Sequence, residues 1–193
     1  MKLIIMVFIF SFFSTFVYSS ENKIYLAGGC FWCLEQAFQE EIGVISAVSG
    51  YSGGKSINPS YKDVSKGDTG HIEALEILYD DNLVSINELL EIFFKNIDPF
   101  DEKGQFCDRG YQYQSAIFIN NKSIETIANK YISKIEKKFV KKVKTMLLKF
   151  DKFYKAEDYH QDYYLKNPIR YNLYKKGCGR ENRLKKISIK FND

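Results

Sequence analysis

Ile24-Tyr25-Leu26-Ala27-Gly28-Gly29-Cys30-Phe31-Trp32-Cys33 is the stretch of sequence that decides the fold. Its first four residues are an apolar run typical of a buried strand. The residues after Trp32 place apolar side chains at helical spacing, at Leu34, Ala37, Phe38 and Ile42. The two glycines between these segments allow the chain to turn sharply. The sequence therefore predicts a strand, a tight turn and a helix that begins at Cys30.

The predicted position of Cys30 at a helix N-terminus suggests a chemical role. Unpaired backbone N–H groups and the helix dipole favour a thiolate at that position, and only the thiolate is a strong nucleophile. A small, buried, apolar cysteine is the alternative that residue type alone favours. The double glycine, the helix start and the aromatic pair Phe31-Trp32 together favour a reactive thiol suited to redox or covalent chemistry.

The first 19 residues are expected to be a signal peptide rather than part of the fold. Lys2 gives a short positive region, Leu3–Val17 is largely apolar, and Val17–Ser20 offers small residues for cleavage. An uncleaved anchor is the alternative, because the apolar stretch is only slightly short for a membrane span. We therefore expect export to a bacterial periplasm, or an anchored protein that faces it.

Residues 20–193 are expected to form a single catalytic domain with a mobile C-terminal tail. The formal net charge of +4 is modest and implies no nucleic-acid partner. The most basic stretch, Lys134–Lys144, overlaps a helical pattern whose apolar residues include Ile135 and Phe139, so its lysines are expected on a solvated outer face.

Strand and helix patterns alternate along this domain. A capping box, Ser85-x-x-Glu88, starts one helix, and Asp98-Pro99 follows its end. The remaining expected elements are strands at 44–48, 72–79, 115–120 and 145–148 and a long helix at 123–139. Short connections between such elements predict a two-layer α/β (α+β) sandwich.

Glu73 is the second informative residue. Strand side chains alternate, so Glu73 is predicted to face the same way as Leu75, Ile77 and Tyr79. A carboxyl group at the head of an apolar row is partly desolvated, which raises its pKa and keeps a proton available near neutral pH. The alternative is that Glu73 marks the solvated end of the strand.

Other polar candidates are ambiguous when each is taken alone. Asp108 and Tyr113 stand five residues apart at a loop-to-strand junction, where they suit the orientation of a ligand or a water. Tyr51 lies beside the Gly53-Gly54 turn. For His160 a hydrogen-bonded structural role is favoured over metal binding, because the chain contains only two histidines.

These separated segments together fit one known family. The matching segments are Gly29–Trp32, Ser49–Gly54, Thr69–Ala74, Asp108–Ile117, Ala156–Tyr163 and, in the tail, Gly177–Arg180. From about Ile24 to about Leu184 the chain resembles the class A peptide-methionine sulfoxide reductases, which reduce the S epimer of methionine sulfoxide. The resemblance implies a ferredoxin-like arrangement with a mixed sheet.

The resemblance also implies a role for each matched residue. Cys30 corresponds to the nucleophile, and Glu73 to the residue that supplies a proton to the sulfoxide oxygen. Phe31 and Trp32 match a pocket for the methyl group on sulfur. The remaining matched residues, two hydrogen-bond donors to that oxygen and a carboxylate that positions substrate and water, are Tyr51, Tyr113 and Asp108.

The resemblance leaves the resolving thiol open. Attack by Cys30 would leave a sulfenic acid, with which a second thiol condenses. Cys33 shares a helix face with Cys30, and Cys178 lies in a glycine-flanked tail, so these two are joint candidates for the resolving thiol. Cys107, beside Asp108, is a third candidate and a possible partner for Cys178. No bound cofactor is expected, because an external thioredoxin-type dithiol reduces the resulting disulfide. The expected substrate is oxidised methionine, free or in proteins.

Two other classes of protein fit parts of the sequence. A strand followed by Cys30-x-x-Cys33 at a helix start also suits a thioredoxin-like disulfide oxidoreductase, although Phe31-Trp32 is an unusual spacer for one. A structural zinc module would use all four cysteines, but only one Cys-x-x-Cys pair is present.

Overall fold

The computed structural model describes residues 21–187. The predicted signal peptide at residues 1–19 lies outside the described residues, and its export role stays a prediction. Within 21–187, no helix combines the length and the apolar character that a membrane crossing requires.

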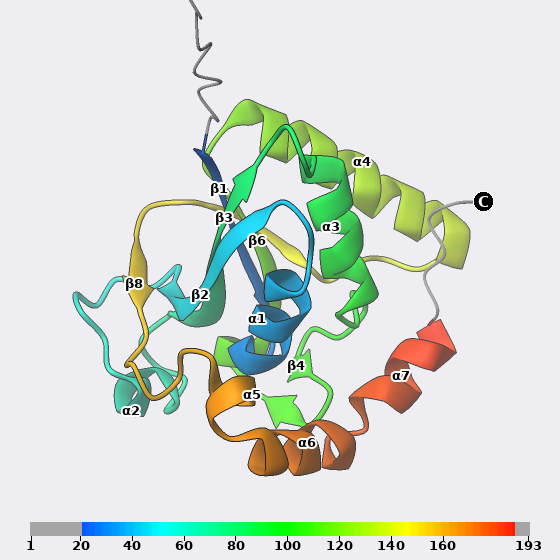
Figure 1. Ribbon diagram of the computed structural model, residues 1–193. Coiled ribbons are helices and arrows are strands. Elements are labelled where there is room, and N and C mark those ends of the chain that lie inside the picture. The colour runs from blue at the N-terminus through cyan, green and yellow to red at the C-terminus, as the bar shows by residue number, and fades with distance from the viewer. Residues whose placement is uncertain (1–20, 188–193) are drawn as a thin grey trace, which may run out of the picture.

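A six-stranded mixed sheet forms one layer of the molecule (Figure 1). Its strands, in spatial order, are β7 (Met146–Lys149), β6 (Ser115–Ile119), β1 (Glu21–Gly28), β3 (Ile72–Asp80), β2 (Val44–Ser52) and β8 (Phe153–Lys155). Only the β6–β7 pair is parallel. The inner order β6-β1-β3-β2, together with the β-α-β-β-α-β sequence of elements, is ferredoxin-like, as predicted.

Three helices pack against one face of this sheet and form the second layer. They are α1 (Phe31–Gln39), α3 (Ile86–Lys95) and α4 (Lys122–Phe139). Leu26, Leu75 and Ile77 of the strands share one core with Leu34 of α1 and Phe93 of α3. The alternate strand positions form a separate cluster on the other face, which Phe150 and Phe153 cover. The period of two in the strands therefore produces the predicted two-layer sandwich.

The helix boundaries follow local signals with one exception. The Ser85 hydroxyl accepts from the Glu88 N–H and the Glu88 carboxylate accepts from the Ser85 N–H, so the predicted capping box is present. α1, however, ends at Gln39, and Ile42 is 84% exposed. The prediction that Ile42 lies on the buried side is wrong, because the chain leaves the helix and turns at Gly43 with a φ of +92° before β2.

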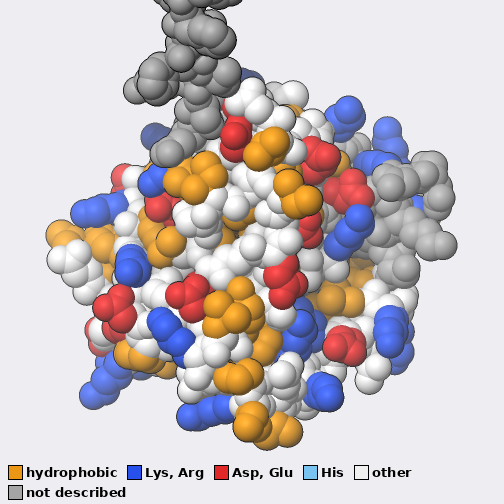
Figure 2. Space-filling view, viewed as in Figure 1, with side chains coloured by type: hydrophobic (Ala, Val, Ile, Leu, Met, Phe, Trp, Pro, Cys, Tyr) orange, Lys and Arg blue, Asp and Glu red, His pale blue; other side chains and the backbone are white. Residues whose placement is uncertain are grey.

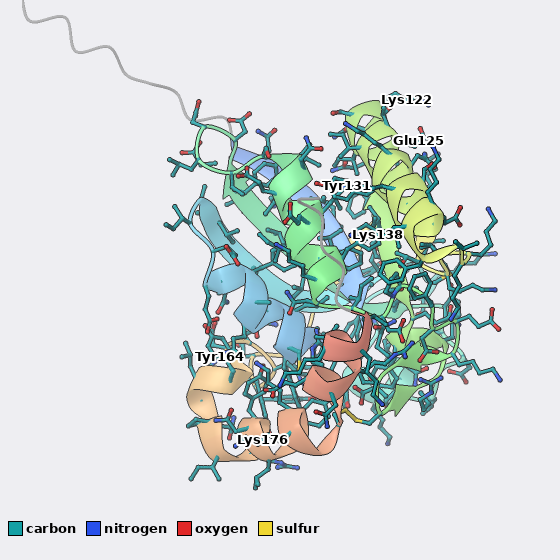
Figure 3. All side chains as sticks on the ribbon, turned by 90° about the vertical axis from the view of Figure 1, so that its right-hand side faces the viewer. Lys122, Glu125, Tyr131, Lys138, Tyr164 and Lys176 are labelled. Carbon is teal, nitrogen blue, oxygen red and sulfur yellow. A yellow bond between two sulfur atoms is a disulfide. The ribbon has the colours of Figure 1, made fainter. Side chains whose placement is uncertain are left out.

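The lysines of α4 point away from the core, as predicted. Its buried residues are Ile124, Ala128 and Ile135. Lys122, at the start of this helix in Figure 3, and Lys138, near its end, are both exposed. On the face shown in Figure 2, basic and acidic side chains are interspersed, which does not suit a nucleic-acid surface.

The C-terminal tail, which was predicted to be mobile, is helical and attached. Its helices are α5 (Tyr163–Lys166), α6 (Pro168–Gly177) and α7 (Arg180–Ile187). Cys178 caps α6 and forms a disulfide with Cys107, which lies between the short strands β4 (Gly104–Gln105) and β5 (Asp108–Arg109). The remaining short elements are α2 (Tyr61–Val64) in the long loop and the 3-10 turn η1 (Tyr111–Tyr113).

Candidate active site

The site is built on the turn between β1 and α1. β1 ends at Gly28, α1 begins at Phe31, and Cys30 is the N-cap residue, as the sequence predicts. Gly29 has a φ of +78°, and a Cβ there would lie 2.5 Å from the Cβ of Gln105. Only glycine therefore allows this turn to bring Cys30 against the helix start.

The Cys30 thiol is buried, and burial disfavours its ionised form. It is 7% exposed, and burial raises its pKa well above the ordinary thiol value. The negative charges of Glu73 and Asp108, when present, raise it further. Desolvation therefore opposes the ionisation that the helix terminus is predicted to favour at Cys30.

Cys33, at the third position of α1, carries the thiolate instead. The Cys30 S–H donates to the Cys33 sulfur, which lowers the pKa of Cys33 to about 6 despite its burial. The positive charges of Arg180 and Lys175 lower this pKa as well. The two thiols form one hydrogen-bonded pair, with its charge on the second cysteine.

Glu73 lies on β3 directly behind the helix start. It is 3% exposed, and its Oε2 accepts a hydrogen bond of 3.1 Å from the Phe31 N–H. Burial raises its pKa well above the usual carboxyl range, which confirms the predicted desolvation. Leu75, Ile77 and Tyr79 continue this row into the core. Glu73 is therefore a buried carboxyl group beside Cys30 whose protonated form is favoured.

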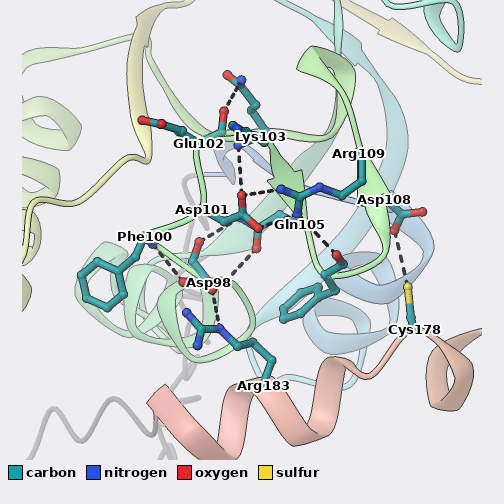
Figure 4. Close-up of polar contacts among 12 residues, drawn as sticks. Asp98, Phe100, Asp101, Glu102, Lys103, Gln105, Asp108, Arg109, Cys178 and Arg183 are labelled. Atoms are coloured by element: carbon teal, nitrogen blue, oxygen red, sulfur yellow. Dashed lines mark hydrogen bonds and ion pairs between the residues drawn. The ribbon is translucent and has the colours of Figure 1, made fainter.

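Asp108 closes the site from β5. The Tyr174 hydroxyl of α6 donates a short hydrogen bond to its Oδ2, and the Cys178 sulfur lies 3.9 Å from the same oxygen (Figure 4). Burial raises the pKa of this carboxyl group. The charges of Cys30, Glu73 and Asp108 act on one another, so three segments distant in the sequence meet here.

The tyrosines of the site are not equivalent. Burial raises the pKa of Tyr113, and so does the charge of Glu73, which it faces. Tyr113 is hydrogen-bonded to Tyr61, which the sequence analysis did not select. The Tyr51 hydroxyl donates to Glu157 at 2.9 Å, so its proton is already engaged. Tyr113 and Tyr61 therefore stand closer to the predicted donor role than Tyr51 does.

An aromatic group surrounds Phe31 and Trp32. Trp32 stacks on Tyr163 with ring centroids 3.7 Å apart, and its Nε1–H donates to the Nδ1 of His160 at 3.1 Å. The centroid of the His160 ring lies 5.0 Å from that of Phe31. This contact agrees with the predicted structural role of His160, and it fixes the orientation of Trp32.

The four cysteines form two separate pairs. Cys107 and Cys178 are joined by a disulfide, which confirms that pairing, while Cys30 and Cys33 are free and buried. Cys107, Cys178 and Asp108 lie close together, but disulfide sulfurs are not metal-binding thiolates. With Cys107 and Cys178 in a disulfide, the four cysteines do not form a zinc site within residues 21–187.

A cysteine pair at a helix start, close to the buried carboxyl group of Glu73, is the arrangement expected from the family resemblance. The model of the family described as peptide methionine sulfoxide reductase matches residues 22–191. The chain belongs to this family. It is accordingly an oxidoreductase that reduces methionine sulfoxide through thiol chemistry, and the thioredoxin-like alternative is set aside.

Two curated relatives support this membership of the methionine sulfoxide reductases. The chain is 46% identical over 158 residues to peptide methionine sulfoxide reductase MsrA 2 of Staphylococcus aureus, covering 81% of this chain and 89% of the relative. It is 47% identical over 164 residues to MsrA/MsrB of Vibrio cholerae, covering 84% of this chain. The match spans only 43% of that Vibrio protein.

Solved reductase structures share the fold. Methionine sulfoxide reductase A of Corynebacterium diphtheriae matches with a TM-score of 0.70 at 32% identity, over 77% of this chain and 76% of that one. Mxr1 of Saccharomyces cerevisiae in complex with Trx2 matches with a TM-score of 0.52 at 21% identity, over 74% and 84%. At that identity the second likeness concerns the fold alone.

Proposed function

We propose that this reductase acts on the S epimer of methionine sulfoxide, with Cys30 as nucleophile and Glu73 as proton donor. The buried position of Glu73 behind the start of α1 carries the proposal. A sulfoxide oxygen leaves only when it is protonated, and Glu73 is a buried carboxyl group at the start of α1 whose raised pKa favours its protonated form. Phe31 and Trp32 supply an apolar surface next to the thiol for the methyl group.

The first step consumes the sulfoxide. The Cys30 sulfur attacks the substrate sulfur while Glu73 protonates the sulfoxide oxygen, and the S–O bond breaks. The Cys30 thiol proton passes to the Cys33 sulfur and from there to the released hydroxide, so the oxygen leaves as water. A water then attacks the Cys30 sulfur, the bond between Cys30 and the substrate sulfur breaks, and a proton returns to Glu73. The products are methionine, reduced by two electrons, and a sulfenic acid on Cys30, oxidised by two. Tyr113 and Tyr61, which both lie near Glu73, serve as donors to the sulfoxide oxygen in place of Tyr51, and Asp108 positions substrate and water.

Cys33 is proposed as the resolving cysteine. Its thiolate attacks the sulfenic sulfur of Cys30, hydroxide departs and takes up a proton, and a Cys30–Cys33 disulfide forms. Cys33 is free and hydrogen-bonded to Cys30, whereas Cys107 and Cys178 are already bonded to each other. These observations favour Cys33 over Cys178 and Cys107.

The regenerating partner is proposed to be a thioredoxin-type dithiol protein, which supplies two electrons to the Cys30–Cys33 disulfide. The related yeast Mxr1, solved with Trx2, supports this partner class. Export to a periplasm, with oxidised envelope proteins as substrates, is proposed on the character of residues 1–19 alone. Membrane attachment would follow only if that segment stays uncleaved.

The test measures methionine release in a single turnover from separated R and S epimers. We expect release from the S epimer only, and Glu73→Gln should slow it by roughly 10²–10⁴-fold, because the amide cannot supply the proton. Glu76→Gln, three positions further along β3 and partly exposed, is the matched control. Full-rate release by Glu73→Gln would contradict the role of Glu73. Dithiol–disulfide exchange without any sulfoxide turnover would contradict the function itself.

A further inference from the structure

Arg180 is a buried charge that the reaction described above does not use. It is the first residue of α7, lies two residues after Cys178, and is only 4% exposed. One of its guanidinium nitrogens donates to the backbone carbonyl of Asn96, and its guanidinium lies 4.6 Å from the centroid of the Phe106 ring. No carboxylate among the described residues lies within ion-pair distance of it. A buried cation that lacks such a partner requires another source of negative charge.

Cys33 is the other side chain at the same place. Arg180 and Cys33 line one cavity of about 220 Å³ between α1 and the tail. The Cys33 sulfur packs against Tyr163 and Tyr171 in a cluster otherwise made of aromatic rings. Cys33 is buried, so an unpaired thiolate there would be costly, and a nearby guanidinium offsets that cost.

We propose that Arg180 is the counter-charge of the Cys33 thiolate and that the Cys107–Cys178 disulfide holds it there. This inference rests on the proposed function, in which Cys33 resolves the sulfenic acid. It makes Arg180 a positioning residue that acts through Cys33. It also gives the exposed disulfide a purpose, because Cys178 and Gly179 are all that separate the end of α6 from Arg180.

Cys30 makes the largest contribution, because its hydrogen bond to the Cys33 sulfur lowers the pKa of Cys33. The other groups that face Cys33 contribute less than Arg180 or in the opposite direction. They are Glu40 and Glu41 of the α1 region, Glu73 of β3, Tyr163 of α5, and Tyr171 and Lys175 of α6. Lys175 is partly exposed and donates to Gln36 at 3.0 Å, so water screens its charge. Among the described residues, Arg180 is the buried cation at this cavity that has no carboxylate within ion-pair distance. Burial raises the pKa of the Asp108 carboxyl group, and the charge of Arg180 partly offsets that rise.

The test follows the titration of Cys33 in the Cys30→Ser chain with the disulfide intact, where Cys33 is the only free thiol. The rate of alkylation by iodoacetamide, followed by mass spectrometry across pH, gives its apparent pKa. Arg180→Gln should raise that pKa by about one unit or more, and Arg180→Lys should restore most of the shift. Arg183→Gln is the matched control, because Arg183 lies on the same helix and pairs with Asp98 at 2.6 Å (Figure 4).

Two results would overturn the proposal. One is an unchanged Cys33 titration in Arg180→Gln while disulfide mapping and circular dichroism show an intact tail. The other is equal titration of the Lys and Gln variants, which would assign the effect to the lost hydrogen bond with Asn96 rather than to charge. Arg180→Lys keeps the test decisive if the Gln variant fails to fold.

A second readout uses Cys30 itself. With Cys30 present, Arg180→Gln should accumulate more dimedone-trapped sulfenic acid at pH 7 than Arg183→Gln, since resolution by Cys33 is slowed. If the chain released no methionine at all, the proposed function would fail, yet the alkylation experiment would still decide the role of Arg180.

Discussion

The two cysteine pairs of this protein differ in how the chain brings them together. Cys30 and Cys33 are three residues apart on one helix, buried and free. Cys107 and Cys178 are separated by 71 residues, join the β4–β5 hairpin to the tail, and form a disulfide. The first pair holds two buried thiols whose pKa values are shifted in opposite directions. The second pair closes a long loop near the surface.

The comparison shows that burial changes the pKa values of the first pair, whereas the covalent bond of the second pair fixes the position of nearby helices. In the first pair, desolvation and the mutual hydrogen bond drive the two pKa values apart, so one thiol is neutral and the other ionised. In the second, a covalent bond fixes helices α6 and α7 beside Asp108, to which Tyr174 donates. The first pair is therefore suited to chemistry and the second to positioning.

The largest expected effect is the loss of methionine release when Cys30 is replaced. Cys30→Ser should abolish methionine release, because it removes the proposed nucleophile at the start of α1. Cys178→Ser should retain release from the S epimer within about one order of magnitude, since the nucleophile and the acid are untouched. Single-turnover assays of methionine release by both variants test this prediction. Loss of release in Cys178→Ser with a folded tail would show that the Cys107–Cys178 pair takes part in the first step of the reaction.

Cys33→Ser separates the two steps of the reaction. The variant is expected to release about one methionine per enzyme and then stop, because a hydroxyl cannot resolve the sulfenic acid. Counting methionine released with a dithiol protein reductant present gives the answer. Sustained turnover would show that Cys107 or Cys178 can resolve Cys30, or that the reductant attacks the sulfenic acid directly.

The surface pair should instead govern stability. Removal of the bridge by Cys107→Ser should cost about 2–4 kcal/mol of unfolding free energy, because a 71-residue loop is no longer closed in the unfolded chain. Denaturant unfolding with and without a reductant measures this. Reduction should lower the stability of the parent chain to that of the variant, and should leave the variant itself unchanged.

The smallest effect concerns another buried group of α1. Glu35 is fully buried, its Oε2 accepts from the Asp162 N–H at 3.1 Å, and burial raises its pKa to about 7. The folded chain then holds a proton that the unfolded chain releases near pH 4.5. This stabilising contribution is present below about pH 4.5 and is lost as pH rises through about 7.

Glu35→Gln should therefore gain stability relative to the parent as pH rises from 5 to 8, by about 1–2 kcal/mol. Urea unfolding at several pH values checks the trend. Glu40→Gln, at the exposed end of α1, serves as the control and should show no such trend. If the unfolding free energies of the parent and Glu35→Gln changed with pH in the same way, the proton taken up on folding would not be on Glu35.

Local sequence was sufficient for much of the fold. The apolar run, the glycine pair and the helical spacing after Trp32 predicted β1, its turn and α1, because these depend on neighbouring residues. Alternation around Glu73 predicted its buried face for the same reason. The end of α1 was misplaced at Ile42, since helical spacing continues past a turn that only Gly43 signals.

The sequence by itself determined the reactive segment: which residue begins the helix, which acid lies in an apolar row, and which family the motifs resemble. Only the tertiary structure decided how charge divides between Cys30 and Cys33, because burial and the approach of Arg180 depend on segments up to 150 residues away in the chain. It likewise decided that Cys178 pairs with Cys107 and that Tyr174 contacts Asp108. Periodicity encodes which face a side chain takes, but the electrostatics of a buried site depend on everything that packs around it.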